Sequence, residues 1–148
     1  MKVYIGADHG GFKLKEKVKL ELSRWGYEVE DMGAHTLNPD DDYPKFAHAV
    51  AEKVSENISA SRGILLCRSG IGMDIVANKV KGIRSAQVFN EEMAKKSREH
   101  EDANILTIAT DYLPEENVLH IIKVWLETAF SNEERHSRRL KQIEKLDN

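Results

Sequence analysis

The sequence has no long hydrophobic run and no excess of charge of either sign. Apolar residues make up 41% of the chain, yet no apolar stretch approaches the roughly 20 residues that a membrane-spanning helix requires. The formal net charge is −3 at pH 7, which gives no reason to expect nucleic acid or an anionic membrane as a partner. The composition therefore predicts a water-soluble protein with no nucleic-acid and no membrane partner.

Cysteine is nearly absent, since Cys67 is the only one in the chain. A single cysteine cannot form an internal disulfide, and the first residues resemble a strand rather than a secretory signal. We therefore expect a cytoplasmic protein. Linkers, internal repeats and low-complexity segments are also lacking, so we expect a single domain over residues 1–148.

Short apolar stretches alternate with segments of helical periodicity along the whole chain. The stretches expected to be strands are residues 2–6, 27–32, 63–67, 83–89 and 105–109. The segments expected to be helices are residues 12–25, 46–54, 73–80, 91–97, 114–130 and, after a cap at Ser131, 131–146. Repeated βα units predict an α/β fold, with a five-stranded parallel sheet, helices on both faces and an additional C-terminal helix.

Residues 63–75 combine a buried strand, a small-residue turn and the start of a helix. The first N–H groups of a helix have no intrahelical partner, so such a turn favours an anion. Cys67 ends the strand, at the edge where open parallel sheets bind ligands, and a thiol near a helix N-terminus ionises more readily than a free one. With Ser69, the loop could supply a base, a proton shuttle and an oxyanion hole. The alternative is an ordinary turn with an inert cysteine.

The same loop superficially resembles a dinucleotide-binding fingerprint because it contains Gly70-x-Gly72. The third glycine of that fingerprint is replaced by Ile75, and the turn follows the third expected strand rather than the first. We therefore expect no nucleotide cofactor at this turn.

Asp8 and His9 follow the first expected strand, so they should lie at the same edge of the sheet as Cys67. The alternative for Asp8 is a helix N-cap, and the alternative for His9 is a solvent-facing loop residue. The acidic run at residues 40–42 is expected to be solvated.

His100 lies in the connection between the fourth helix and the fifth strand, which places it at the edge of the sheet opposite Cys67. A symmetric dimer could bring it to the neighbour's site, whereas the alternative is a surface histidine. Arg135 and Arg139 are one helical turn apart, and two guanidinium groups on one face suit a phosphate. Their alternative is a solvated basic face.

Several short blocks occur in a characteristic order. They are Gly6-x-Asp8-His9-Gly10-Gly11-Phe12, Asp42-Tyr43-Pro44, Cys67-x-Ser69-Gly70-Ile71-Gly72, Ala77-Asn78-Lys79, Gly82-Ile83-Arg84, Ser97-Arg98-x-His100 with Ala103-Asn104, and Arg135-His136-x-x-Arg139. With these blocks the chain resembles the type B ribose-5-phosphate isomerases over nearly its whole length. The same family also holds galactose-6-phosphate and allose-6-phosphate isomerases.

The resemblance implies a Rossmann-like three-layer sandwich that forms a homodimer, or in some members a tetramer. It implies an active site shared between subunits, a sugar phosphate as the small-molecule partner, and no metal or nucleotide cofactor. In such enzymes the residue matching Cys67 removes the proton from C2 of an open-chain aldose phosphate, and the hydroxyl matching Ser69 assists proton transfer between O1 and O2. The histidine matching His100 opens the sugar ring in the partner's site, with Asp8 nearby.

The resemblance also implies a set of substrate-binding residues. Backbone N–H groups of the loop from Gly70 to Gly72 stabilise the ene-diolate. His9, Arg135 and Arg139 hold the phosphate. A further member of the set, Tyr43, lies near the sugar.

The sequence departs from the family's pattern at Arg68, Asp74, Glu101 and Asp111. Arg68 replaces a glycine, and Asp111 reverses the charge of an arginine near the phosphate. We therefore predict that Arg68 also belongs to the substrate-binding set, and that it pairs with Asp111 or reaches toward the same anion. The alternative is that it points into solvent.

The four departures leave more than one function open. The first is conversion of ribose 5-phosphate to ribulose 5-phosphate. The second is isomerisation of another aldose phosphate, such as allose 6-phosphate, galactose 6-phosphate or a tetrose phosphate. The third is a catalytically weak sugar-phosphate-binding subunit.

Overall fold

Five parallel strands form one sheet in a computed structural model that describes residues 1–147. The strands are β1 (Lys2–Ala7), β2 (Glu28–Asp31), β3 (Ser61–Cys67), β4 (Ser85–Gln87) and β5 (Ile105–Ala109). The helices are α1 (Phe12–Arg24), α2 (Tyr43–Glu56), α3 (Ile71–Ala77), α4 (Glu91–Glu99), α5 (Glu115–Glu127) and α6 (Glu134–Glu144). The strand order is β2-β1-β3-β5-β4, and every pairing is parallel. The predicted α/β fold with its additional C-terminal helix is confirmed.

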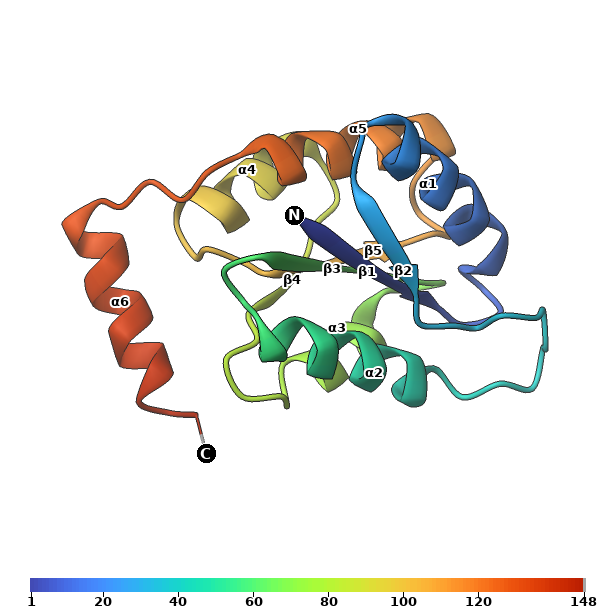
Figure 1. The fold of residues 1–148 in the computed structure, drawn as a ribbon, viewed down its shortest axis with the longest axis horizontal. Coiled ribbons are helices and arrows are strands. Elements are labelled where there is room, and N and C mark those ends of the chain that lie inside the picture. The colour runs from blue at the N-terminus through green and yellow to red at the C-terminus, as the bar shows by residue number, and fades with distance from the viewer. Residues whose placement is uncertain (148) are drawn as a thin grey trace.

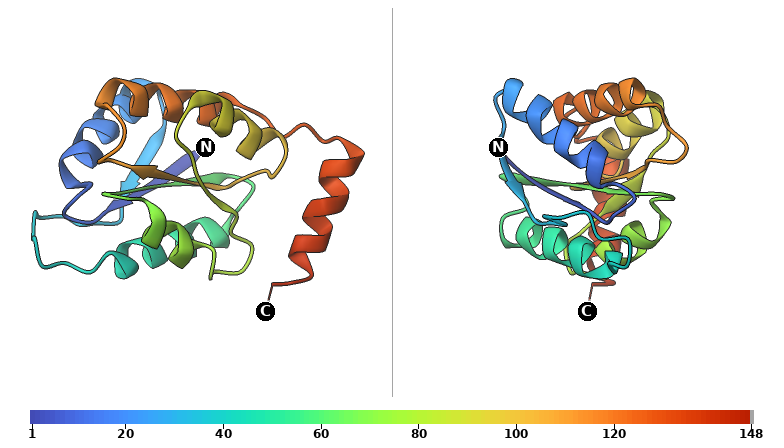
Figure 2. Two further views of the ribbon diagram at one scale, coloured as in Figure 1. Left: turned by 180° about the vertical axis from the view of Figure 1, so that it is seen from behind. Right: turned by 90° about the vertical axis from the view of Figure 1, so that its right-hand side faces the viewer.

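The sheet lies between two layers of helices (Figure 1). Helices α1, α4 and α5 cover one face, α2 and α3 cover the other, and the sheet is seen nearly edge-on between them in Figure 2. Two buried clusters fill the layers. Val18, Leu22 and Trp125 belong to the first, and Val50 and Met73 belong to the second. This arrangement follows from the alternation of apolar strands and amphipathic helices in the sequence.

Helix α6 lies beyond the amino ends of the strands, opposite the long loop between β2 and α2 (Figure 1). Its connection to α5 is extended and keeps it away from the two helical layers. Within residues 1–147, no helix combines the length and apolar character that a membrane crossing would need.

Some element boundaries differ from the sequence predictions. The fourth strand is limited to residues 85–87, because it is an edge strand that pairs only with β5. Helix α6 begins at Glu134, so the prediction that Ser131 caps it was wrong. The Ser131 hydroxyl instead accepts a hydrogen bond from the Glu133 N–H at 3.2 Å and contacts Nδ1 of His136 at 2.7 Å.

The helices that follow two neighbouring strands, β1 and β3, pack on opposite faces of the sheet. Helix α1 follows β1 onto one face of the sheet, whereas α3 follows β3 onto the other. Because β1 and β3 are neighbours, the turns that leave them diverge at their carboxyl ends, where open parallel sheets bind their ligands, and we call this place the crevice. Thr110 ties the two turns together, since its hydroxyl lies 3.2 Å from the carbonyl oxygens of both Gly10 and Cys67.

A fully buried lysine joins α1 to the end of β2. Lys15 Nζ lies 2.7 and 2.8 Å from the two carboxylate oxygens of Asp31 and also donates to the Ala34 carbonyl. Burial alone would raise the pKa of Asp31, but hydrogen bonds from Lys15 and Lys19 outweigh it and lower that pKa. The Lys15–Asp31 pair thus fixes the start of the loop between β2 and α2, and residues further along this loop lie at the crevice.

We predict unequal effects when the two lysines that contact Asp31 are replaced. Lys15→Met should lower the free energy of unfolding by about 3 kcal/mol, because it leaves a half-buried carboxylate without its interior partner. Lys19 contacts the same carboxylate but is more exposed. Lys19→Met should therefore lower the free energy of unfolding by about 1 kcal/mol or less. Urea unfolding of both variants measures the difference, and equal losses would contradict the assigned role of Lys15.

Candidate active site

Cys67 ends β3 inside the crevice and is 5% exposed. The N–H of Gly70 donates a hydrogen bond to its sulfur at 3.1 Å. Gly70 has a φ of +77°, a conformation that glycine adopts without the steric cost of a side chain. The turn between β3 and α3 therefore directs a backbone donor at the thiol, as the sequence predicted.

The electrostatic surroundings of Cys67 contradict the expectation that its thiol ionises readily. Burial raises the pKa of the Cys67 thiol, and the nearby charge of Asp8 raises it further. Backbone hydrogen bonds from Gly70, Met73 and Ser69 lower that pKa, but the net shift within one chain is upward. The expectation that the helix start makes this thiol ionise more readily was wrong, because desolvation outweighs the backbone donors.

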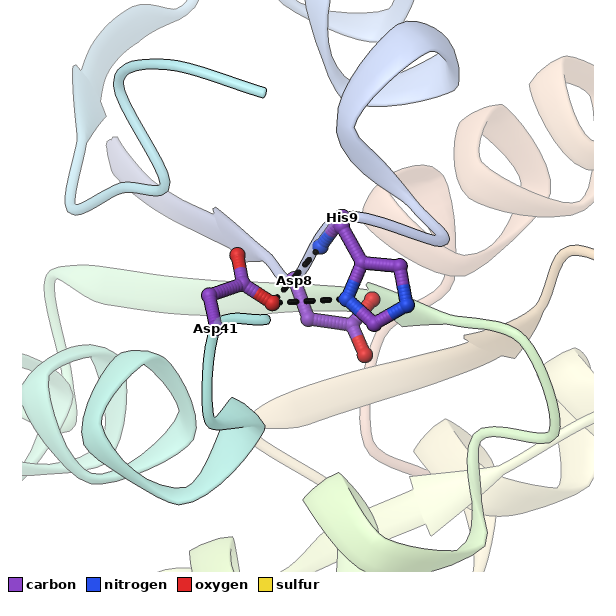
Figure 3. A group of neighbouring side chains, drawn as sticks. All are labelled: Asp8, His9 and Asp41. Carbon is purple, nitrogen blue, oxygen red and sulfur yellow. Dashed lines mark hydrogen bonds and ion pairs between the residues drawn. The ribbon is translucent and has the colours of Figure 1, made fainter. Parts of the chain in front are cut away.

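Asp8, His9 and Asp41 form a cluster beside the crevice (Figure 3). Asp8 Oδ1 accepts hydrogen bonds from the N–H groups of Gly10 at 2.9 Å and Gly11 at 3.2 Å. Asp8 thus organises the turn that leads into α1. This role is similar to that of a helix N-cap, the alternative that the sequence left open for Asp8. Asp41 Oδ1 contacts the His9 backbone N–H at 3.1 Å and Nδ1 at 2.7 Å.

Asp41 shows that the acidic run is not uniformly solvated. Its side chain is 3% exposed, whereas its neighbours Asp40 and Asp42 are exposed as predicted. The hydrogen bond from His9 explains the burial, and that bond raises the pKa of His9. The histidine is consequently favoured as a cation at the rim of the crevice.

The same three side chains are the group among residues 1–147 whose ligand atoms lie close enough to hold a metal ion, all within 4.8 Å of one another. Asp8 Oδ1 and Asp41 Oδ1 accept hydrogen bonds from the backbone and from His9, whereas within residues 1–147 Asp41 Oδ2 is buried without a hydrogen-bond partner. The contacts therefore describe a partly satisfied hydrogen-bonded network in which the bond to Asp41 raises the pKa of His9.

Arg68 pairs with Asp111 across the ends of β3 and β5. Arg68 Nε lies 2.9 Å from Asp111 Oδ2, and the Arg68 stem packs over Gly10 at the start of α1. The predicted pairing is confirmed. The two side chains are 68% and 44% exposed, so the pair contributes little to stability but changes the charge that faces the crevice.

Tyr43 reaches the loop that follows Cys67. The tyrosine begins α2, and its ring lies so close to Gly72 that a Cβ placed there would be 2.5 Å from the ring carbon Cζ. Only glycine allows the ring to approach the loop this closely. Tyr43 is thus brought to the same end of the molecule as Ser69, Gly70 and Gly72.

His100 lies at the opposite end of the sheet, as the sequence predicted. It caps α4 just before β5 begins at Ile105, whereas Cys67 pairs with Ala109. Those four residue steps along β5 alone amount to about 13 Å of strand. The ring of His100 stacks on His136 of α6, with centroids 4.3 Å apart.

Arg135 and Arg139 are exposed on α6 at this same distant end. Arg135 forms an ion pair with Glu133, its Nε lying 2.9 Å from Oε2. Within one chain, the structure therefore separates these two arginines and His100 from the crevice.

Asp74, one of the unusual residues, turns away from the crevice. The hydroxyl of Ser85 on β4 donates to Asp74 Oδ1 at 2.7 Å, and Ser85 lies 3.0 Å from the hydroxyl of Thr107 on β5. Burial raises the pKa of Asp74, and these hydroxyl groups oppose that rise. The carboxylate is thus held beneath α3 by hydroxyl groups rather than by a cation. Another unusual residue, Glu101, is exposed at the distant end.

Sequence reasoning missed three residues around the crevice, namely Asp41, Thr110 and Gln87, and the two hydroxyl residues that hold Asp74 beneath α3, Ser85 and Thr107. The detectable signal was polarity at positions where a strand should be apolar, since Ser85 and Gln87 interrupt the fourth strand and Thr107 interrupts the fifth. Asp41 had no comparable signal, because its neighbours are also acidic.

The chain matches known proteins over nearly its whole length. The family model "Ribose/Galactose Isomerase" matches residues 3–143. A probable ribose-5-phosphate isomerase B of Mycoplasma genitalium is 36% identical over 95% of this chain and 92% of its own length. A putative sugar phosphate isomerase of Bacillus subtilis is 42% identical over 97% of this chain and 95% of its own.

Solved structures resemble the chain equally closely. A ribose-5-phosphate isomerase B of Clostridium thermocellum is 43% identical, with a TM-score of 0.93 over 99% of this chain and 97% of that one. The enzyme of Mycoplasma genitalium with bound ribulose-5-phosphate is 34% identical, with a TM-score of 0.95 over 98% of this chain and 95% of that one.

We predict that Asp8→Asn lowers the pKa of the Cys67 thiol. The substitution removes the negative charge that raises this pKa and keeps an oxygen that can accept the turn's N–H groups. Because Cys67 is the only cysteine, its alkylation by iodoacetamide reports the thiolate alone. The rate should rise severalfold at neutral pH. Asp40→Asn, in the exposed loop, should leave the rate unchanged. A slower reaction of Asp8→Asn would contradict the prediction.

Proposed function

The chain belongs to the ribose/galactose isomerase family, and from that premise we propose that it interconverts ribose 5-phosphate and ribulose 5-phosphate through an ene-diolate. The observation that carries the proposal is the position of Cys67, buried at the end of β3 with the Gly70 N–H on its sulfur. The Mycoplasma genitalium relative binds ribulose-5-phosphate, which supports this pair of sugars.

The reaction needs a base, a proton shuttle and donors for a developing negative charge. The Cys67 thiolate removes the proton from C2 of the open-chain aldose and returns it to C1. The Ser69 hydroxyl passes the other proton from O2 to O1, so that the aldehyde becomes an alcohol and C2 becomes a ketone. No electrons leave the sugar. Backbone N–H groups of Gly70 to Gly72, fixed by the turn, stabilise the charge on oxygen.

The phosphate requires more positive charge than one chain supplies at the crevice. His9 and Arg68 lie there, but they face the carboxylates of Asp41 and Asp111. A phosphate carries close to two negative charges at neutral pH. The exposed Arg135 and Arg139 at the other end of the molecule are suited to provide the rest in a second copy.

The complete site is therefore a homodimer, with α6 of each subunit reaching the crevice of its partner. In that arrangement Arg135 and Arg139 hold the phosphate together with His9, and His100 of the partner subunit opens the sugar ring near Asp8. Tyr43 lines the sugar. Added arginines would also lower the pKa of the Cys67 thiol, opposing burial and Asp8. Chemistry that depends on one free thiol fits a reducing cytoplasm.

The contacts of Asp111 and Asp74 support a working enzyme over a weakly binding subunit. Asp111 is paired with Arg68, and Asp74 is held beneath α3 by Ser85. Neither carboxylate is left unpaired beside the place of an anionic substrate. Asp111 is thus paired with a neighbouring cation and Asp74 is held by hydroxyl groups, so the charge pattern of the crevice changes without leaving either carboxylate isolated.

We predict that Cys67→Ala abolishes isomerisation, with a loss of at least about 10²-fold to 10⁴-fold, the contribution usual for a positioned base. The substitution removes the sulfur and creates only a small cavity, so the fold should persist. A coupled assay with ribose 5-phosphate measures turnover, and calorimetry measures binding of the sugar phosphate. Cys67→Ala should still bind. Near-normal turnover would exclude Cys67 as the base.

We predict that two inactive variants complement each other when their subunits exchange. A mixed dimer of Cys67→Ala and His100→Ala contains one site with both wild-type residues. About half of the exchanged dimers are mixed and each has one intact site, so about a quarter of the wild-type activity should return. A mixture of Cys67→Ala with Cys67→Ser should recover nothing. Absence of recovery despite demonstrated exchange would argue against a shared site.

A further inference from the structure

One peptide group of the loop after β3 makes a hydrogen bond at each of its two ends. Its N–H belongs to Gly70 and donates to the Cys67 sulfur at 3.1 Å. Its carbonyl belongs to Ser69 and accepts a hydrogen bond from the side-chain amide of Gln87. Because the C=O and N–H of a trans peptide point in opposite directions, these two contacts define one orientation of the group.

The orientation is not fixed by the loop backbone alone. Gly70 has a φ of +77° and no side chain, and glycine reaches several other conformations at little cost. A rotation of this peptide would direct the carbonyl, rather than the N–H, toward the sulfur. That arrangement would repel a thiolate instead of stabilising it.

Gln87 is well placed to prevent such a rotation. It is half-buried on β4, where it pairs in register with Thr107 of β5. Its amide also fills the space beneath the loop, since a Cβ placed on Gly70 would lie 2.6 Å from Gln87 Nε2 and 3.1 Å from Cδ. The side chain thus approaches the peptide from a fixed strand and donates to its carbonyl.

We propose that Gln87 is a positioning residue, whose amide holds the Ser69–Gly70 peptide so that the Gly70 N–H stays directed at the Cys67 sulfur. The Gln87 side chain donates to the Ser69 carbonyl rather than to the sulfur, so in this proposal it acts through one peptide group. The inference rests on the proposed role of Cys67 as base. It adds a residue of β4 to those that control ionisation of the thiol.

The chain offers a matched control on the same strand. Ser85 and Gln87 are two residues apart on β4 and therefore point to the same side of the sheet. Ser85 contacts Asp74 within α3, whereas Gln87 contacts the loop. The charged side chain that acts on Cys67 is Asp8, at the end of β1, and it is unchanged in either variant.

The test compares iodoacetamide alkylation of the single cysteine as a function of pH in wild type, Gln87→Met and Ser85→Ala. Gln87→Met keeps the length of the side chain and removes the donor. We expect its alkylation curve to move to higher pH by about one unit, with about tenfold slower reaction at neutral pH, because one hydrogen bond to a thiolate is worth about that factor. The curve of Ser85→Ala should coincide with that of wild type.

An unchanged curve in folded Gln87→Met would overturn the proposal. An equal shift in Ser85→Ala would also overturn it, because that result would reflect general loosening of β4. Circular dichroism establishes folding. Should Gln87→Met fail to fold, Gln87→Leu removes the donor without adding a charge and must shift the curve in the same direction.

Turnover separates this proposal from the proposed function. In the coupled assay Gln87→Met should lower kcat and leave KM for the sugar phosphate unchanged, since the proposed phosphate contacts, His9, Arg135 and Arg139, come from segments other than β4. A shifted alkylation curve with unchanged kcat would support Gln87 as a positioning residue and count against Cys67 as the base. An unshifted curve would refute the role of Gln87 whatever the activity.

Discussion

The conflict between burial and ionisation at Cys67 governs the arrangement of the crevice. A thiol at the end of a central strand is desolvated, which disfavours the thiolate that base catalysis requires. The adjoining turn opposes this cost with backbone donors, led by the N–H of Gly70. Backbone N–H groups are suited to the task because they carry no charge that could attract the phosphate to the wrong place. Their direction then has to be controlled, and in our proposal the contact from Gln87 provides that control from β4, the edge strand beyond β5.

The distribution of charge between the two ends of the molecule gives a physical reason for assembly. At the carboxyl ends of the strands, Arg68 and His9 are matched by Asp111 and Asp41. At the amino ends, α6 carries exposed arginines away from the two helical layers (Figure 1). One subunit therefore lacks the cations that a dianionic substrate needs, and a second copy can supply them. In the proposed homodimer the same arginines would favour the thiolate, so assembly would also promote ionisation of the proposed base.

Much of this architecture was predictable because the relevant signals are local. Apolar runs and helical periodicity located five parallel strands, and the position of Cys67 after β3 followed from that order. The burial of Asp41 was not predictable, because it depends on a histidine 32 positions earlier in the chain. The upward pKa shift of Cys67 was missed for a similar reason. It results from three-dimensional packing around the sulfur and from Asp8 on another strand, which a helix-terminus argument does not include.

Arg68 and Asp111 redistribute the charge at the carboxyl ends of β3 and β5. The family's pattern implies an arginine after the fifth strand and a glycine after the cysteine, whereas this chain has an aspartate and an arginine at those positions. Because β3 and β5 are neighbours, their ends are close enough for Arg68 Nε to reach Asp111 Oδ2 at 2.9 Å. The pair leaves the guanidinium at the rim, with its remaining N–H groups free of this contact. A solvent-exposed pair of this kind adds little to stability, so its consequence lies in the field that an anionic substrate meets on entering the crevice.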